Sequence, residues 1–323
     1  MYKVRKSNGS INQRVFMELE FKPRDGITLS SLRSKLEEYH PDIYLETEHG
    51  GMYEISLRYP ECRMYYNTNV LIEKWIAIQE DLRPFAKEPT PSCGLHLHID
   101  VSEYDPIQIS NIYNQFYEFQ KVYQLIIPSS RWMDNVNCKE VNYSLAHRVW
   151  ENAKLYKTGQ ISSDEFRRNI SGMKFYGLST NRLVDFGTLE WRWNQFTIDQ
   201  HKLANTIKYH INLTNYWAGM VNNRWARFKG LKKPYTGNLY NRISVDVDEF
   251  AKPNRFTKGN RIPKDIYWSW MQVFGYGSEN TELRDWCESR TRKLGNHGIG
   301  KNSDCMLKGI SDAYGERLGN TRV

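Results

Sequence analysis

Residues 93–101, which read Cys-Gly-Leu-His-Leu-His-Ile-Asp-Val, decide the fold. Apolar and polar side chains alternate without interruption, which is the pattern of a β-strand with one face in the core. The apolar side chains fall on one side of this strand, and His96, His98 and Asp100 fall on the other. A strand that places two imidazoles and a carboxylate on one face indicates a binding or catalytic surface more than an ordinary solvated face.

Three further segments repeat this alternation: 14–22, 51–59 and 186–196. Their polar sides carry Glu18 and Glu20, Glu54 and Arg58, and Glu190 and Arg192, respectively. If the four strands share one sheet, these side chains meet on one surface. Carboxylates this close repel one another unless cations neutralise them, and hard divalent ions such as Mg²⁺ prefer carboxylate oxygens and bring phosphates with them. The pattern therefore predicts a metal–phosphate site on a sheet, with helices covering the apolar side.

The helices are predicted from apolar residues at helical spacing and from capping residues. Asp105-Pro106 is a helix N-cap followed by proline, and it opens a long amphipathic helix. Other helices are expected at 28–39, 67–85, 139–156, 162–170 and 199–220, and a further strand at 174–180. Strands and helices in this mixture predict an α+β protein.

Composition and charge set limits on the class of protein. The chain has 323 residues, of which 40% are hydrophobic, and its five cysteines are scattered. We therefore expect a globular, cytoplasmic protein without a disulfide framework or a membrane partner. The formal net charge is +8, and residues 221–323 carry all of this excess. We expect a domain over 1–222 and a basic, partly helical accessory region over 223–323 that attracts nucleic acid or another polyanion.

Four motifs, in order, resemble the signature of the putative amidoligase family over roughly residues 14–220. They are Phe16-Met-Glu-Leu-Glu-Phe21, Tyr53-Glu-Ile-Ser-Leu-Arg-Tyr-Pro60, Ser92-Cys-Gly-Leu-His-Leu-His-Ile-Asp100 and Gly187-Thr-Leu-Glu-Trp-Arg-Trp193. That family consists of carboxylate–amine ligases with the glutamine synthetase and glutamate–cysteine ligase fold. Glu48 is a departure, because it stands where the family often has an aspartate in the turn over 46–51.

The resemblance implies a curved, mostly antiparallel sheet with helices packed on its convex face, and ATP with Mg²⁺ (or Mn²⁺) on the concave face. It implies that Glu18, Glu20, His96 and Glu190 bind the metals, and that Glu54 is a further ligand. It places His98 near the ATP phosphates and Arg192 on the transferred phosphoryl group. Arg131, in Pro128-Ser-Ser-Arg-Trp132, would bind phosphate or a substrate carboxylate, and Arg58 is a further candidate for ATP.

The implied reaction forms an amide through an acyl phosphate, and its substrates are a carboxylate and an amine, either of which could belong to a macromolecule. Glu54 or Asp100 could take the proton from the attacking ammonium, and the sequence does not choose between them. The resemblance also implies a homo-oligomer. Two alternatives stay open: a metal-dependent hydrolase built on His96 and His98, and a non-catalytic nucleic-acid-binding or assembly protein on a ligase scaffold.

Overall fold

The computed structural model describes residues 14–57, 68–87, 90, 92–132, 135–227, 283, 285–287 and 289–290. Arg58 and nearly all of the predicted accessory region 223–323 lie outside these residues. The chain divides into two compact units, one of Met1–Tyr117 with Ser129–Val221 and the other of Glu118–Pro128 with Asn222–Val323. Within the second unit, Arg290 Nε donates a hydrogen bond to the carbonyl of Ile126 at 2.9 Å. The candidate site belongs to the first unit.

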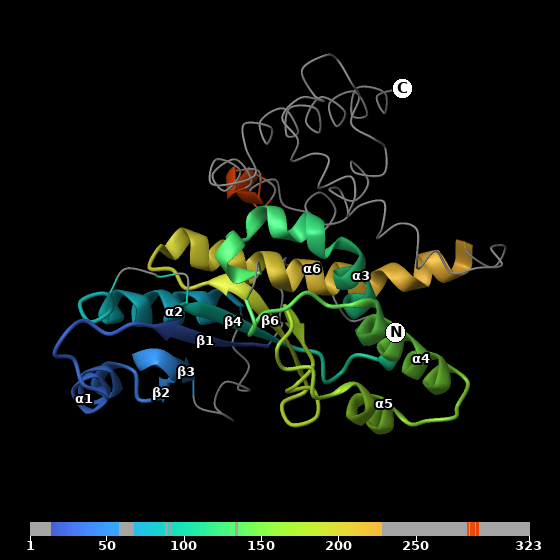
Figure 1. Ribbon diagram of the computed structural model, residues 1–323, viewed down its shortest axis with the longest axis horizontal. Coiled ribbons are helices and arrows are strands. Elements are labelled where there is room, and N and C mark those ends of the chain that lie inside the picture. Colours follow the sequence, from blue (N-terminus) through green and yellow to red (C-terminus); the bar gives the residue numbers. More distant parts are fainter. Residues whose placement is uncertain are drawn as a thin grey trace, which may run out of the picture. The chain divides into compact units, whose positions relative to one another are not determined.

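The first unit is built on a six-stranded sheet (Figure 1). Its strands are β1 (Val15–Phe21), β2 (Ile43–Glu48), β3 (Met52–Leu57), β4 (Gly94–Asp100), β5 (Leu178–Ser179) and β6 (Thr188–Gln195). They lie in the order β2-β3-β1-β4-β6-β5, and every neighbouring pair is antiparallel. The sheet is open, because β2 and β5 are its edges. The prediction of an α+β protein with an antiparallel sheet is confirmed.

The helices lie between these strands in the chain or follow the last one, and they mostly begin where the sequence predicts. They are α1 (Leu29–Tyr39), α2 (Thr68–Leu82), α3 (Pro106–Tyr123), α4 (Tyr143–Lys157), α5 (Ser163–Ile170) and α6 (Gln200–Arg227). Short 3₁₀ turns occur at His49–Gly51, Gln124–Ile126 and Ser129–Arg131. Capping explains the starts: the Thr28 and Ser162 side chains accept hydrogen bonds from backbone N–H groups of the first turns of α1 and α5.

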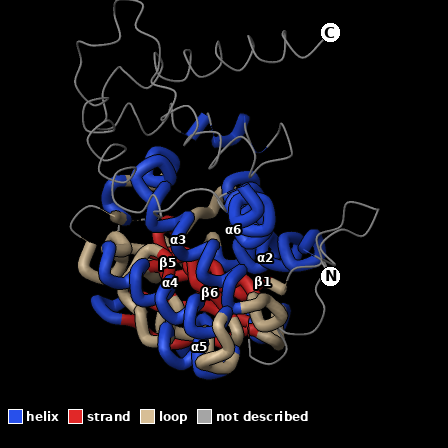
Figure 2. The backbone as a smooth tube through the Cα atoms, turned by 90° about the vertical axis from the view of Figure 1, so that its right-hand side faces the viewer, coloured by secondary structure: helices blue, strands red, loops and turns tan. Residues whose placement is uncertain are grey.

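The apolar side of the sheet packs against α3 and α6. Trp191 and Trp193 are fully buried on this side, and the ring of Phe116 in α3 lies 5.4 Å from Trp191 and 5.1 Å from Trp193 between centroids. The indole N–H of Trp191 donates to the hydroxyl of Thr214 in α6 at 3.2 Å. Figures 1 and 2 show α2, α3 and α6 together on one side of the strands. This layer of helices leaves the opposite face of the sheet for the polar side chains.

Two strands differ from the prediction. Ile43–Glu48 forms an edge strand, where the sequence indicated only a turn over 46–51; the turn is shorter and relies on Gly50 and Gly51, both with positive φ. The strand predicted at 174–180 shrinks to Leu178–Ser179. Gly177 has no room for a side chain there, because a Cβ would lie 2.3 Å from the ring of Trp193.

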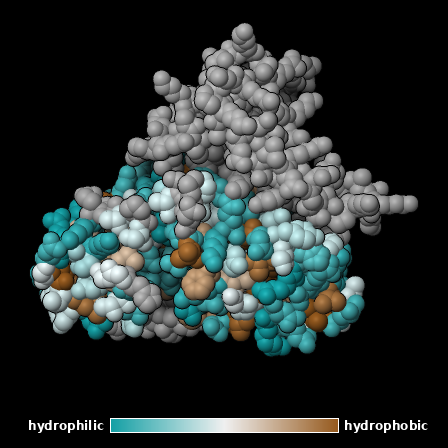
Figure 3. Space-filling model, in the orientation of Figure 1, coloured by the Kyte–Doolittle hydropathy of each residue, from teal (hydrophilic) through white to brown (hydrophobic). Residues whose placement is uncertain are grey.

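On the face of the described part that Figure 3 shows, hydrophobic residues form small separate spots among hydrophilic ones. None of the helices in the described ranges is long and apolar enough to cross a membrane.

Candidate functional site

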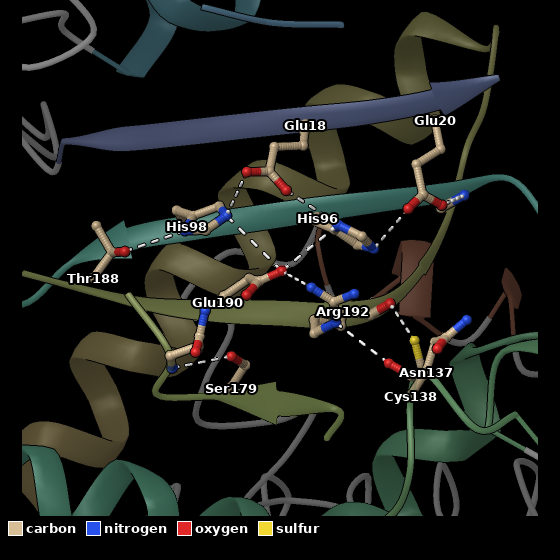
Figure 4. Close-up of polar contacts among 12 residues, drawn as sticks. Glu18, Glu20, His96, His98, Asn137, Cys138, Ser179, Thr188, Glu190 and Arg192 are labelled. Carbon is tan, nitrogen blue, oxygen red and sulfur yellow. Dashed lines mark hydrogen bonds and ion pairs between the residues drawn. The ribbon is translucent and has the colours of Figure 1, made fainter. Parts of the chain in front are cut away.

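The polar face of the three neighbouring strands β1, β4 and β6 holds a cluster of carboxylates and imidazoles (Figure 4). Strand β4 supplies both histidines from the centre of this group. The register sets Glu18 of β1 opposite His96, and Glu190 of β6 opposite His98. The pairing of β4 with β6 shifts between Leu95 and Leu97, next to His96. The structure thus brings together four residues that the sequence could place only on the same face.

The contacts in this cluster are short and mutual. Glu18 accepts from both imidazoles, with its Oε2 3.2 Å from His96 Nδ1 and its Oε1 3.3 Å from His98 Nε2. Glu190 Oε1 lies 3.6 Å from His96 Nδ1 and 3.9 Å from His98 Nε2. Glu20 approaches the other side of His96, with 3.7 Å between Oε1 and Nε2. Each histidine therefore faces at least two carboxylates.

Two overlapping triads of these residues could each hold a metal ion. Glu18, His98 and Glu190 form one, and Glu18, Glu54 and His96 form the other; in each, three ligand atoms lie within 4.8 Å of one another. Glu18 is common to both. Each triad has two carboxylates and one imidazole, a donor set that suits a hard divalent cation. The buried Nε2 of His98 faces Glu18 Oε1 at 3.3 Å and Glu190 Oε1 at 3.9 Å, and so it lies against both carboxylates of the first triad.

The electrostatics of Glu18 follow from these neighbours. Burial by itself raises the pKa of Glu18, but the charge of His98 and the hydrogen bonds from both histidines outweigh it, so the pKa falls well below its usual range. Burial likewise lowers the pKa of His98, but Glu18 and Glu190 reverse this and the net shift is upward. The protein without a cation therefore keeps Glu18 as an anion and favours a charged His98 beside it.

Glu54 lies next to this cluster in a row of carboxylates. On β3 it pairs with Glu20 on one side and with Glu46 of β2 on the other. Burial, together with the charges of Glu18, Glu20, Glu48 and Glu46, raises the pKa of Glu54 to about 9. Burial is the larger cause and the crowded carboxylates add to it, so in the protein without a cation Glu54 favours its protonated form.

Two buried arginines border the cluster on the side of β6. Arg192 forms an ion pair with Glu190 and donates from Nε to the carbonyl of Asn137 at 3.4 Å. Burial lowers the pKa of Arg192, but the Glu190 carboxylate overcomes this and raises it. Arg131, which is 3% exposed, donates from Nη2 to the carbonyl of Arg192 at 2.9 Å. Its Nε is buried without a hydrogen-bond partner.

Gly94, the first residue of β4, lies against three side chains of the site. Its N–H donates to Glu20 Oε2 at 2.8 Å. A Cβ at this position would lie 2.6 Å from Glu20 Oε2, 2.8 Å from Arg131 Nη2 and 2.9 Å from His96 Nε2. The glycine before the two histidines therefore leaves room for three side chains of the site, and a Cβ there would displace them.

Asp100 lies at the end of β4 beyond His98, and the structure does not place it within the two triads. Its carboxylate pairs with Arg14, with 3.6 Å between Oδ2 and Nη1, and accepts from the backbone N–H of Ser102 at 2.8 Å. Arg58, the other residue predicted at ATP, lies outside the described residues.

Several contacts of the site could not be found by motif. Thr188 Oγ1 lies 3.1 Å from His98 Nδ1, and its only sequence signal is its position two residues before Glu190. The Cys138 thiol lies 3.5 Å from Arg131 Nη2, and burial raises its pKa. Asn137 contributes a backbone carbonyl, which any residue type could supply, so the sequence carries no signal for this contact.

Comparison with known families identifies the family of this chain. The family model described as "Putative amidoligase enzyme" matches residues 12–214, and the chain belongs to this family. The match contains all six strands and ends within α6. No curated protein matches the chain.

Proposed function

We propose that this member of the amidoligase family is an ATP- and Mg²⁺-dependent carboxylate–amine ligase, with the sheet curved as in glutamine synthetase. The observation that carries the proposal is the polar face itself. Three carboxylates and two imidazoles converge on neighbouring strands, and a buried arginine pairs with one of the carboxylates. A cluster of this kind suits phosphoryl transfer, in which positioning and neutralisation of oxygens supply most of the catalysis.

The residues present fit a pair of divalent cations. Glu18 would be shared, with His98 and Glu190 on one side and Glu54 and His96 on the other, and Glu20 beside His96. Bound there, Mg²⁺ or Mn²⁺ would neutralise phosphate oxygens and hold them in place. His98 would lie beside the phosphates, since it belongs to the triad that would hold one of the cations.

In the first step, a carboxylate oxygen of the acid attacks the γ-phosphorus of ATP. The bond from that phosphorus to the β,γ-bridging oxygen breaks, and ADP leaves. Arg192 stabilises the transferred phosphoryl group, because its guanidinium is held in place by Glu190 and the Asn137 carbonyl. Arg131 binds the carboxylate of the acid or a phosphate oxygen through its unpaired Nε.

In the second step, the amine attacks the acyl carbon, phosphate leaves and an amide forms. A base must take a proton from the attacking ammonium. Glu54, which lies beside Glu18 and Glu20, and Asp100, which pairs with Arg14, are the two candidates for this role. Because burial and the neighbouring carboxylates raise the pKa of Glu54, it would act as a base only once bound cations offset that charge and release its proton.

The two alternative functions are less well supported. A hydrolase built on His96 and His98 would be expected to use further histidines, but among the described residues His40 pairs with Asp81 and His210 is buried against the carbonyl of Thr206. A polyanion-binding role rests on 223–323, which lies outside the described residues, so it stays a prediction, as do the homo-oligomer and the cytoplasmic location.

Hydroxylamine tests the reaction without knowledge of the amine. It attacks acyl phosphates to give hydroxamates, so the full chain would be incubated with ATP, Mg²⁺, hydroxylamine and pools of carboxylic acids. We expect hydroxamate and ADP in equal amounts, abolished in Glu190→Gln and retained in Glu151→Gln, whose side chain lies exposed on α4. Hydroxamate formed without ATP, or ADP formed in amounts unrelated to hydroxamate, would contradict the acyl-phosphate route.

A further inference from the structure

Beyond His98, the polar face of the sheet ends in aromatic side chains. The ring of Phe16 on β1 meets the imidazole of His98 edge-on, with 5.0 Å between centroids. Phe16 also meets Phe186, at 6.4 Å and an angle of 76°. The guanidinium of Arg182 lies over the ring of Phe186, 5.1 Å from its centroid. We call Phe16, Phe186 and Arg182 the aromatic end.

This aromatic end is continuous with the cluster of carboxylates and imidazoles. Phe16 lies two residues before Glu18 on the same face of β1, a separation of about 7 Å along the strand. It pairs with His98 across the β1–β4 ladder. Phe186 lies two residues before Thr188, whose hydroxyl contacts His98. A ligand that extends from the cations along the polar face therefore reaches these rings.

The backbone holds Phe186 in place. The N–H of Phe186 donates to the carbonyl of Arg182 at 3.0 Å, which closes the turn. The next residue, Gly187, has a φ of 69° and accepts from the N–H of Val101 at 2.8 Å. A Cβ on Gly187 would lie 2.8 Å from that of Ser102. A turn fixed to the end of β4 in this way is suited to present a ring to a ligand.

The exposure of these residues also points to a ligand. Phe16, Phe186 and Arg182 are all partly exposed, whereas the large aromatic residues on the other face, Trp191 and Trp193, are fully buried. Aromatic rings that remain open to solvent beside a polar site offer faces for stacking, and an arginine over one ring adds a cation for a planar, electron-rich partner.

We propose that the aromatic end binds the purine base of ATP, with the triphosphate extending along the polar face to the carboxylate–imidazole cluster. This assignment rests on the proposed function, since it requires a nucleotide at the cations. Stacking on Phe186 and Arg182 supplies affinity for the base without reading its hydrogen-bonding edge. The Asp100–Arg14 pair lies at the same end of β4 and offers polar contacts to the base or ribose.

Comparing ATP with inorganic tripolyphosphate separates the base from the phosphates. Calorimetric titration with each ligand in Mg²⁺ would use the full chain, Phe186→Leu and the matched control Phe175→Leu, a phenylalanine that is 47% exposed elsewhere. We expect wild type to bind ATP more tightly than tripolyphosphate. Phe186→Leu should bind ATP about tenfold more weakly than wild type and should bind tripolyphosphate with unchanged affinity. Phe175→Leu should bind both ligands like wild type.

Every other outcome contradicts either the base site or the nucleotide dependence. Equal affinity of wild type for ATP and tripolyphosphate removes the base site, whatever the variants do. Phe186→Leu that binds ATP like wild type, or that loses both ligands together, removes it too. No binding of either ligand by wild type overturns the proposed nucleotide dependence itself, which distinguishes that failure from failure of the aromatic end alone.

Discussion

Replacing Gly94 by alanine would test whether the glycine at the start of β4 is needed for metal binding at the site or for the stability of the fold. The added methyl would come within 2.9 Å or less of Glu20 Oε2, Arg131 Nη2 and His96 Nε2. All three atoms are ends of side chains that can rotate away, and Gly94 lies in an extended strand where alanine is not strained. The change should therefore displace the proposed ligands and leave the fold nearly intact.

The expected loss is similar to that for residues that orient metal ligands. We predict a 10- to 100-fold drop in Mn²⁺ affinity, or about 1.4–2.7 kcal/mol, with unfolding free energy within about 1 kcal/mol of wild type. Mn²⁺ titration followed by electron paramagnetic resonance measures the first quantity, and urea denaturation in EDTA measures the second.

Gly177→Ala is the matched control, because the same methyl there would lie 2.3 Å from the buried ring of Trp193. It should reduce unfolding free energy by about 1–3 kcal/mol through overpacking. If Gly94→Ala binds Mn²⁺ like wild type, or if it destabilises the fold as much as Gly177→Ala does, then Gly94 does not serve the site as we infer.

Two further predictions concern pH. Burial lowers the pKa of His210 to about 4 from 6.5, so the unfolded chain takes up this proton first and stability falls as the pH drops through that window. Between pH 7 and pH 4 this proton uptake should cost the wild type about 3 kcal/mol of unfolding free energy. Urea denaturation at the two pH values should show that His210→Phe lacks this loss, and a variant that loses as much as wild type would refute the prediction. Burial and neighbouring carboxylates raise the pKa of Glu54 to about 9 from 4.5, so in the metal-free protein stability falls as the pH rises through that range. Glu54→Gln should therefore melt higher than wild type in EDTA at pH 8 by calorimetry, and an equal or lower melting temperature would contradict the assigned charge crowding.

The sequence was sufficient to predict which residues share the polar face. Strict alternation in 14–22 and 93–101 determines on which side of each strand Glu18, His96 and His98 fall, because side chains alternate with a period of two. Alternation does not determine how far one strand slides along the next. The pairing of Glu18 with His96 and of Glu190 with His98 therefore required the structure.

Other features had weak signals for physical reasons. The edge strand Ile43–Glu48 carries Tyr44 half exposed, and Glu46 and Glu48 as charges, which blunts its strand pattern and suits an edge. The contact between Arg192 and Asn137 uses a backbone carbonyl. Asp100 shares a face with His96 and His98, but lies near the end of β4 and pairs with Arg14, which only the three-dimensional arrangement could show.

The most direct measurement is calorimetric titration of ATP into wild type, Glu190→Gln and the exposed control Glu151→Gln, each first in EDTA and then in Mg²⁺. Glu190 contacts both imidazoles and pairs with Arg192, whereas Glu151 lies on α4 with Lys154. We predict Mg²⁺-dependent ATP binding in wild type and Glu151→Gln that is lost in Glu190→Gln. Absence of nucleotide binding in wild type, together with a tightly held zinc or iron ion, would contradict the ligase site.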